Sequence, residues 1–180
     1  MLKLSYKIFM VVILLASCSS DLSTMGPDGK PLPKIYRLSM QKTAEVQFRM
    51  LDAVNALRSS SGVGEVSLNS RLNAAAATHS RDMYIQNRPW HFGSDGSSPL
   101  DRVRRVGYLG QLSGEVISET YETELETLSA WVKNENTRRV LLDSNAKELG
   151  FSWHQETSGK IWWVLVLGEN SLRNEVSRVE

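Results

Sequence analysis

The sequence predicts an α/β domain built as a three-layer α-β-α sandwich around a central, mainly antiparallel sheet. Two observations support this fold class. Apolar residues recur at helical spacing through most of the chain before residue 145, whereas the last third carries two segments with strand character. The final strand, over residues 161–167, is apolar on both faces, so helices must cover both sides of the sheet.

Residues 1–17 have the character of an export signal. Lys3 and Lys7 accompany an apolar run over residues 8–16, which is shorter than the about 20 residues that a membrane-spanning helix needs. The segment Leu15-Ala16-Ser17-Cys18 matches a lipobox, in which the cysteine receives a lipid before the signal peptidase cleaves. We therefore expect a lipoprotein signal peptide and a lipid such as palmitate on Cys18. The alternative is an ordinary signal peptide followed by an incidental cysteine.

Composition narrows the class of protein further. Cys18 is the only cysteine, so no intramolecular disulfide can form, and an exported domain without disulfides suits a bacterium. Loss of Lys3 and Lys7 with the signal takes the formal charge from +1 to −1. This balance gives no electrostatic reason to expect nucleic acid as a partner.

The mature chain divides into a tether and one domain. Residues 19–33 are rich in Ser, Gly and Pro, which predicts a flexible tether over residues 18–40. Residues 41–175 are long enough for a single domain with its own core. This arrangement places the domain outside the cytoplasm, on the periplasmic side of a membrane, and Ser19 after the cysteine favours an outer membrane where one exists.

Three helices are expected before the first long strand. The first runs from about Gln41 to the glycines at 62 and 64, and its apolar face comprises Val46, Met50, Ala53, Val54 and Leu57. The second follows Asn69, an acceptable N-cap, and its stripe comprises Leu72, Ala75, Ala76, His79 and Met83. The third opens at Ser98-Pro99, and its apolar face comprises Leu100, Val103 and Val106.

The rest of the chain alternates strand and helix patterns. A strand is expected over residues 114–120 and a shorter helical segment over 137–142. Between them the pattern predicts a helix over 124–132, with Leu125, Leu128, Trp131 and Val132 facing inward. A hairpin ends the domain: its first strand includes Leu149, Phe151 and Trp153, a turn covers 157–160, and the doubly covered strand follows.

An ordered set of short motifs resembles one known family. The motifs are Leu68-Asn69 with His79-Ser80 and Asp82-Met83, Trp90-His91 with Gly93 and Asp95-Gly96, Pro99 with Asp101-Arg102-Val103, Gly107-Tyr108, Gly114-Glu115, Trp131, and Glu148-Leu149-Gly150. They are similar to the bacterial branch of the CAP (SCP) family, which includes cysteine-rich secretory proteins, insect venom antigens and plant pathogenesis-related proteins. The resemblance covers roughly residues 45–170.

The resemblance implies an α-β-α sandwich with a groove lined by two histidines and two glutamates, which holds a divalent metal in some members. His91 and Glu115 match two of these positions. Thr137 stands where bacterial relatives have histidine, and Asn134 where eukaryotic relatives have glutamate. Glu135 lies one residue out of register, which turns a side chain by about 100 degrees on a helix.

The residues present supply an incomplete metal set. A catalytic zinc normally has three protein ligands and a water, whereas His91 and Glu115 supply two. Glu135 is the candidate for a third ligand, and Trp90 either forms a wall of the groove or packs structurally. His79 is interpreted as a buried core histidine in preference to a groove ligand, and His154 as a solvated strand residue.

Asp82, Asp101 and Arg102 are expected to fix the loops around the second and third helices. The chain has no Gly-x-Ser-x-Gly elbow, and its only cysteine is assigned to lipid, so nucleophilic catalysis has little support. The incomplete set favours a non-catalytic role without a cofactor.

Three hypotheses for the function compete. The leading one is an envelope lipoprotein, anchored to the membrane by its N-terminal lipid, that binds or scaffolds a lipid, a glycan or another envelope protein. The alternative is a metal-dependent periplasmic hydrolase, with zinc as the metal and with His91 and Glu115 as its ligands or as acid and base. A purely structural role is the third.

Overall fold

The computed structural model describes residues 35–170. The predictions for the signal peptide, for Cys18, for the tether before residue 35 and for residues 171–175 lie outside the described residues. A compact unit begins at Ile35. Its elements, in chain order, are η2 (Met40–Lys42), α1 (Thr43–Ser60), β1 (Ser67–Leu68), α2 (Ser70–Gln86), α3 (Pro99–Arg105), β2 (Gln111–Thr120), α4 (Glu124–Lys133), α5 (Glu135–Leu141), β3 (Glu148–Gln155) and β4 (Ile161–Glu169).

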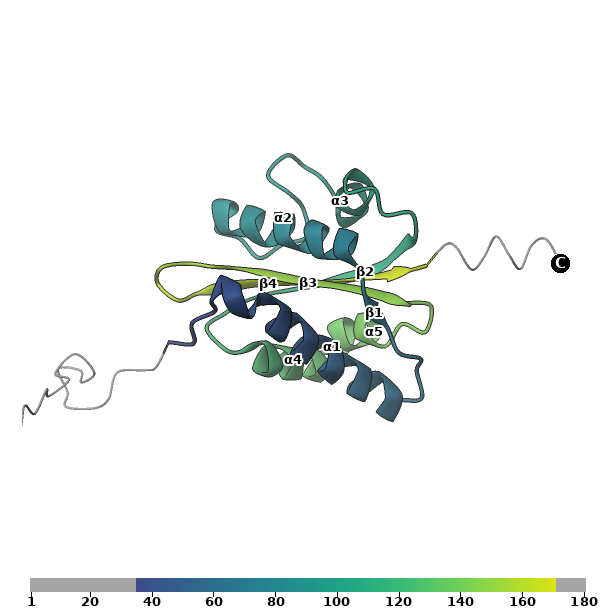
Figure 1. Cartoon of the computed structure of the whole chain (residues 1–180). Coiled ribbons are helices and arrows are strands. Elements are labelled where there is room, and N and C mark those ends of the chain that lie inside the picture. The colour runs from purple at the N-terminus through teal and green to yellow at the C-terminus, as the bar shows by residue number, and fades with distance from the viewer. Residues whose placement is uncertain (1–34, 171–180) are drawn as a thin grey trace, which may run out of the picture. The chain divides into compact units, whose positions relative to one another are not determined.

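The elements form three layers, as the sequence predicts. The sheet lies between α2 and α3 on one face and α1, α4 and α5 on the other (Figure 1). Its strand order is β1-β3-β4-β2, in which β1 pairs with β3 in parallel and the other neighbours are antiparallel. The short strand β1 and its parallel pairing were not expected, so the sheet is mixed at that edge.

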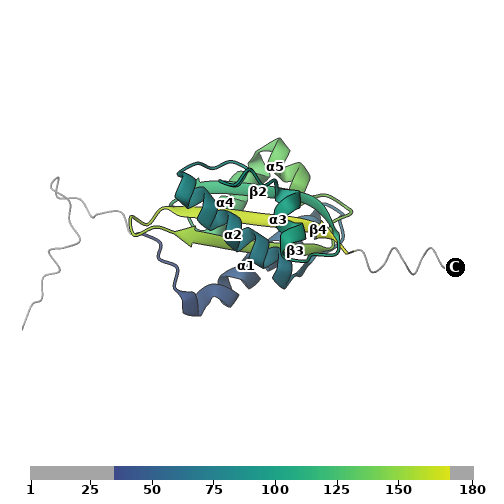
Figure 2. The ribbon, with the colours of Figure 1, turned by 90° about the horizontal axis from the view of Figure 1, so that it is seen from above.

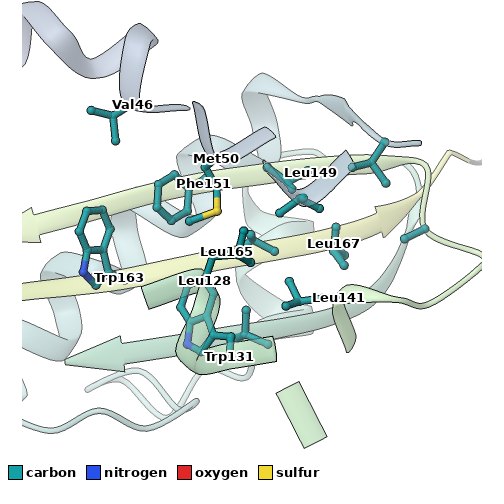
Figure 3. Close-up of a cluster of buried hydrophobic side chains, with 14 of the residues drawn as sticks. Val46, Met50, Leu128, Trp131, Leu141, Leu149, Phe151, Trp163, Leu165 and Leu167 are labelled. Carbon is teal, nitrogen blue, oxygen red and sulfur yellow. The ribbon is translucent and has the colours of Figure 1, made fainter. Parts of the chain in front are cut away.

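Strand β4 supplies both halves of the core, because successive side chains of a strand point to opposite faces. Ile161, Trp163, Leu165 and Leu167 belong to the apolar cluster under α1, α4 and α5, and Figure 3 shows the last three of them beside Phe151 and Met50. Trp162, Val164 and Val166 belong to the second cluster, under α2 and α3. Both tryptophans are fully buried, one on each face.

Helix starts follow the expected capping chemistry. The Asn69 side chain accepts hydrogen bonds from the backbone N–H groups of Arg71 and Leu72, and Ser98 forms a capping box with Asp101 at the start of α3. Thr123 forms a second capping box at the start of α4. These local bonds fix where each helix begins.

Two leucines that the periodicity placed in the core are exposed. Leu100 is 38% exposed and Leu125 is 44% exposed. In α4 the inward position beside Leu125 is taken by Glu124, whose carboxylate accepts hydrogen bonds from Tyr36 at 2.7 Å and from Arg49 at 2.7 Å. A hydrogen-bonded polar group can occupy a buried position, and apolar periodicity does not reveal it.

The ordered domain starts before residue 41, the predicted end of the tether. The Gln155 side chain donates to the Tyr36 carbonyl at 2.7 Å and accepts from the Leu38 N–H at 3.0 Å. The Arg37 guanidinium donates to the Thr157 carbonyl at 2.9 Å. Residues 36–38 are therefore fixed to the β3–β4 hairpin. The described part of this unit therefore has a four-stranded sheet and an apolar cluster on each face of it.

Candidate functional site around Glu115

Glu115 is a buried carboxylate on an edge strand. It lies on β2, opposite Val166 of β4, and shares a face of the sheet with the apolar cluster under α2 and α3. Its side chain is 3% exposed. A carboxylate taken from water at this depth needs hydrogen bonds and a counter-charge.

Arg102 supplies that counter-charge from α3. Its Nη2 donates to Glu115 Oε1 at 2.9 Å and to Oε2 at 2.8 Å, and its side chain is 4% exposed. The same guanidinium donates to the carbonyls of Ser97 at 3.0 Å and His91 at 2.9 Å. Arg102 thus fixes the loop before α3, as the sequence predicts, and also neutralises Glu115, which the sequence did not indicate.

His91 connects the buried carboxylate to the surface. Its Nδ1 lies 2.9 Å from Glu115 Oε1, while half of its side chain, 50%, is exposed. An ionised carboxylate only accepts hydrogen bonds, so Nδ1 carries the proton of this bond. The structure therefore brings together the two residues of the predicted metal set, His91 and Glu115.

His79 is both a core histidine and a neighbour of the site. It is fully buried on α2, and its Nε2 lies 3.0 Å from the Trp90 carbonyl and 3.7 Å from Glu115 Oε1. Because the carbonyl only accepts, Nε2 carries the proton, and Nδ1 finds no hydrogen-bond partner among the described residues. Burial lowers the pKa of His79, so the ring is neutral near pH 7.

The charge state of Glu115 follows from opposing effects. Burial raises the pKa of its carboxyl group, but the hydrogen bonds from His91 and Arg102 and the positive charge of Arg102 lower it, and the net shift is downward. The site consists, near pH 7, of a buried anion paired with a buried cation, with one accessible imidazole beside them.

Trp90 packs against the end of α2 and against its own loop. Its indole Nε1 donates to the Gln86 side chain at 2.7 Å, the Arg88 guanidinium lies 3.8 Å from its ring centroid, and the Phe92 ring lies 5.6 Å away. Its backbone carbonyl is the one that receives His79. Trp90 therefore positions the segment leading into His91.

The predicted third ligand does not join the site. The exposed carboxylate of Glu135 pairs with Arg139, one turn further along α5. Asn134 is the N-cap of α5, accepting from the backbone N–H groups of Asn136 and Thr137. The Thr137 hydroxyl donates to the Trp131 carbonyl. Asn134 and Thr137, the residues at the two substituted family positions, thus stabilise the α4–α5 junction.

This donor set does not fit a tight divalent metal. Within residues 35–170, no group of three or more His, Cys, Asp and Glu side chains is arranged so that it could hold a metal ion. A metal at Glu115 would also have to share its oxygens with a guanidinium cation at 2.8 Å. The identity of His91 and Glu115 as metal ligands stays a prediction.

His154 differs from the sequence expectation. It is half-buried, and its ring stacks against Tyr84 of α2 with centroids 4.4 Å apart. Burial and the nearby Arg81 charge lower its pKa. The interpretation as a solvated strand residue was wrong because α2 packs over β3 at this point.

The fold and the site define an α-β-α sandwich in which a loop histidine, His91, pairs with a glutamate on an edge strand, Glu115. The family model described as "Cysteine-rich secretory protein family" (CAP) matches residues 51–167. The chain belongs to this family, as the ordered motifs had indicated.

Similar proteins include two from Bacillus subtilis. The uncharacterized protein YkwD is 26% identical over 67% of this chain, and the uncharacterized membrane protein YlbC is 29% identical over 62%. These matches span 46% and 32% of the two relatives, so the chain covers less than half the length of each. In the described part of this chain, no helix has the length and apolar character needed to cross a membrane.

Solved structures share the fold at low identity. An outer surface protein of Borrelia burgdorferi gives a TM-score of 0.67 at 14% identity, covering 77% of this chain and 100% of that one. An extracellular SCP-domain protein of Bacillus anthracis gives 0.66 at 21% identity, covering 74% of this chain and 45% of that one. These likenesses establish the sandwich fold.

Proposed function

We propose that this protein is a lipid-anchored, extracytoplasmic CAP-domain protein that binds a ligand or partner in the cell envelope without metal-dependent catalysis. One observation carries the proposal: Arg102 neutralises Glu115 inside the domain. The carboxylate that would have to hold a metal is already ionised, paired and shielded. What remains accessible is His91, which suits recognition at the surface.

The location in this proposal rests on the N-terminal sequence. A basic segment, a short apolar run and the Leu-Ala-Ser-Cys18 box favour export and lipidation. Two structural neighbours are an outer surface protein and an extracellular protein, which agrees with export. Metabolic labelling with an alkyne fatty acid tests the anchor: we expect label and membrane fractionation that Cys18→Ser abolishes. Label that persists in Cys18→Ser would refute lipidation at this residue.

Zinc titration of residues 19–180 tests the proposal that the protein acts without a metal. Calorimetry with the wild type and with His91→Ala should give the same weak or absent signal, because two ligands without a third bind zinc poorly. Removal of Zn²⁺ should leave the apoprotein folded and its melting temperature unchanged. Micromolar or tighter zinc binding that disappears in His91→Ala would overturn the proposal.

The exposed His91 favours one competing function. Its Nδ1 is held by a carboxylate and its Nε2 is free to accept a proton, which is the arrangement of a general base. Hydrolysis of peptide or cell-wall material, measured with and without a chelator, separates the cases. Activity that is lost in both His91→Ala and Glu115→Gln and also in the presence of chelator would support the metal-dependent hydrolase instead.

A further inference from the structure

A pocket of about 410 Å³ lies between α2, α3 and the loop that precedes α3. Neither His91 nor Glu115 lines it. The two helices lie side by side on one face of the sheet (Figure 2). The volume of the pocket falls within the range of small-molecule sites, about 300–1,000 Å³.

Three arginines line this pocket. Arg81 comes from α2, and Arg102 and Arg105 come from α3. Arg81 is exposed and forms no ion pair or hydrogen bond to another described residue, so its charge is available to a ligand. Arg102 is 4% exposed, and its Nε finds no hydrogen-bond partner among the described residues.

The unpartnered Nε of Arg102 indicates a ligand. A buried donor without an acceptor costs about 1–3 kcal/mol of stability. The two terminal nitrogens of the same guanidinium are engaged by Glu115 and by the Ser97 carbonyl. An acceptor atom entering the pocket would therefore complete the hydrogen bonding of a group that the fold already holds rigid.

The two acidic residues of the pocket are already occupied. Asp82 accepts from the N–H of Ser94 at 2.7 Å and from its hydroxyl at 2.6 Å. Asp95 accepts from the N–H of Ser97 at 2.9 Å and pairs with Arg105. Arg105 is set against Asp95 and Arg102 against Glu115, so Arg81 is the pocket arginine that has no ion pair with a described residue. Arg102 adds the N–H of its unpartnered Nε, and these two groups are the donors that the pocket offers to an anion.

The rest of the wall is apolar. Ala75 and Ile85 contribute from α2, and Val106 contributes from the end of α3. Ile85 is among the exposed large hydrophobic side chains of the domain, which marks this part of α2 as a surface with apolar area to cover. Charge on one side and apolar surface on the other suit an amphiphilic molecule.

We infer that this pocket binds a small organic anion, with a carboxylate or phosphate monoester head group on a compact apolar body. The head group would contact Arg81 and Arg102, and the body would cover Ala75, Ile85 and Val106. This inference goes beyond the proposed function, since it assigns a second site and its ligand class. Failure of the zinc test at His91 would leave it standing.

The test uses residues 19–180, which keep the whole compact unit, and three probes of equal chain length. We expect saturable binding of hexanoate or of hexyl phosphate by NMR titration, and binding of neutral hexanamide at least about ten-fold weaker, since charge-assisted hydrogen bonds are lost. Tighter binding of one anion identifies the preferred head group. Equal affinity for hexanamide and for the better anion would overturn the inference, as would no saturable anion binding in the millimolar range.

Matched variants locate the site. Arg81→Gln should weaken anion binding about five-fold or more, whereas Arg71→Gln, on the same helix but outside the pocket, should leave it unchanged. Thr78→Phe places a ring into the pocket from an exposed helix position and should abolish binding. Equal weakening by Arg71→Gln and Arg81→Gln would show a general charge effect and contradict the site, and so would full binding in Thr78→Phe.

Discussion

Breaking the ion pair between Arg102 and Glu115 should destabilise the domain strongly, and breaking it from both sides should cost less than the two changes added. Arg102→Met removes hydrogen bonds to Glu115, to the Ser97 carbonyl and to the His91 carbonyl. It also leaves the carboxylate of Glu115 buried with only imidazole partners. Removal of one member of a buried pair typically costs about 3–5 kcal/mol.

The magnitude can be refined from the contacts. Glu115 keeps the hydrogen bond from His91 Nδ1 in Arg102→Met, so we expect the lower half of that range, about 3–4 kcal/mol. In Glu115→Leu the guanidinium keeps two carbonyl acceptors, so we expect about 3 kcal/mol. The double variant has no unpaired charge and should lose about 3–4 kcal/mol, giving a coupling of about 2–4 kcal/mol.

Urea denaturation followed by tryptophan fluorescence measures these free energies, because three tryptophans lie in the two buried clusters. Arg104→Met is the matched control: Arg104 is exposed on the same helix, and its loss should change the unfolding free energy by less than about 0.5 kcal/mol. If the Arg102 and Glu115 changes add without coupling, the ion pair is not the interaction that stabilises this site.

Two further predictions concern packing and protonation. Gly150→Ala should destabilise by about 2–3 kcal/mol, because its new Cβ would overlap the backbone of Leu72 where α2 crosses β3. In Gly64→Ala the nearest atom would be Lys147 Nζ at 4.0 Å, so this control should change little, and an equal loss in both would argue against the close approach. Because the pKa of His79 is depressed, its contribution to stability is present above its unfolded pKa of about 6.5 and falls at lower pH, with a slope of up to about 1.4 kcal/mol per pH unit. His79→Gln should flatten the slope below about pH 6.5, and an unchanged slope would contradict a buried neutral ring.

The layers were predictable because β4 carries its burial pattern in its own residues. An apolar run with no polar alternate position requires cover on both faces, and Trp162 and Trp163 do lie in opposite clusters. Helix starts were predictable for a similar reason, since Asn69 and Ser98 cap their helices through bonds to residues two or three positions away. Local interactions of this kind can be predicted from a single sequence.

Strand β1 could not be predicted, because its two residues are placed by pairing with β3, about 80 positions later. The role of Arg102 was missed for the same physical reason. Asp101-Arg102 reads as a helix-start pair, and only the fold brings Glu115 of β2 under α3.

The sequence of α1 does contain a pattern that indicates a buried arginine. Val46, Met50 and Val54 form a stripe with a spacing of four, and Arg58 continues it. In the structure Arg58 is fully buried, and it donates to the carbonyls of Leu141 at 2.8 Å and Ala146 at 3.1 Å. An arginine on an apolar stripe therefore indicates a group of carbonyls to be satisfied, and Arg102, directly before Val103 on α3, is a second example of a buried arginine within this domain.

The Glu115 carboxylate pairs with the Arg102 guanidinium and does not coordinate a metal. Crystals of residues 19–180 grown with zinc, measured at the zinc absorption edge, test it most directly. The structure predicts no anomalous peak within about 2.2 Å of both a His91 ring nitrogen and a Glu115 carboxylate oxygen, and an Arg102 guanidinium that stays in contact with Glu115. A zinc peak bonded to both His91 and Glu115, with Arg102 displaced, would contradict it.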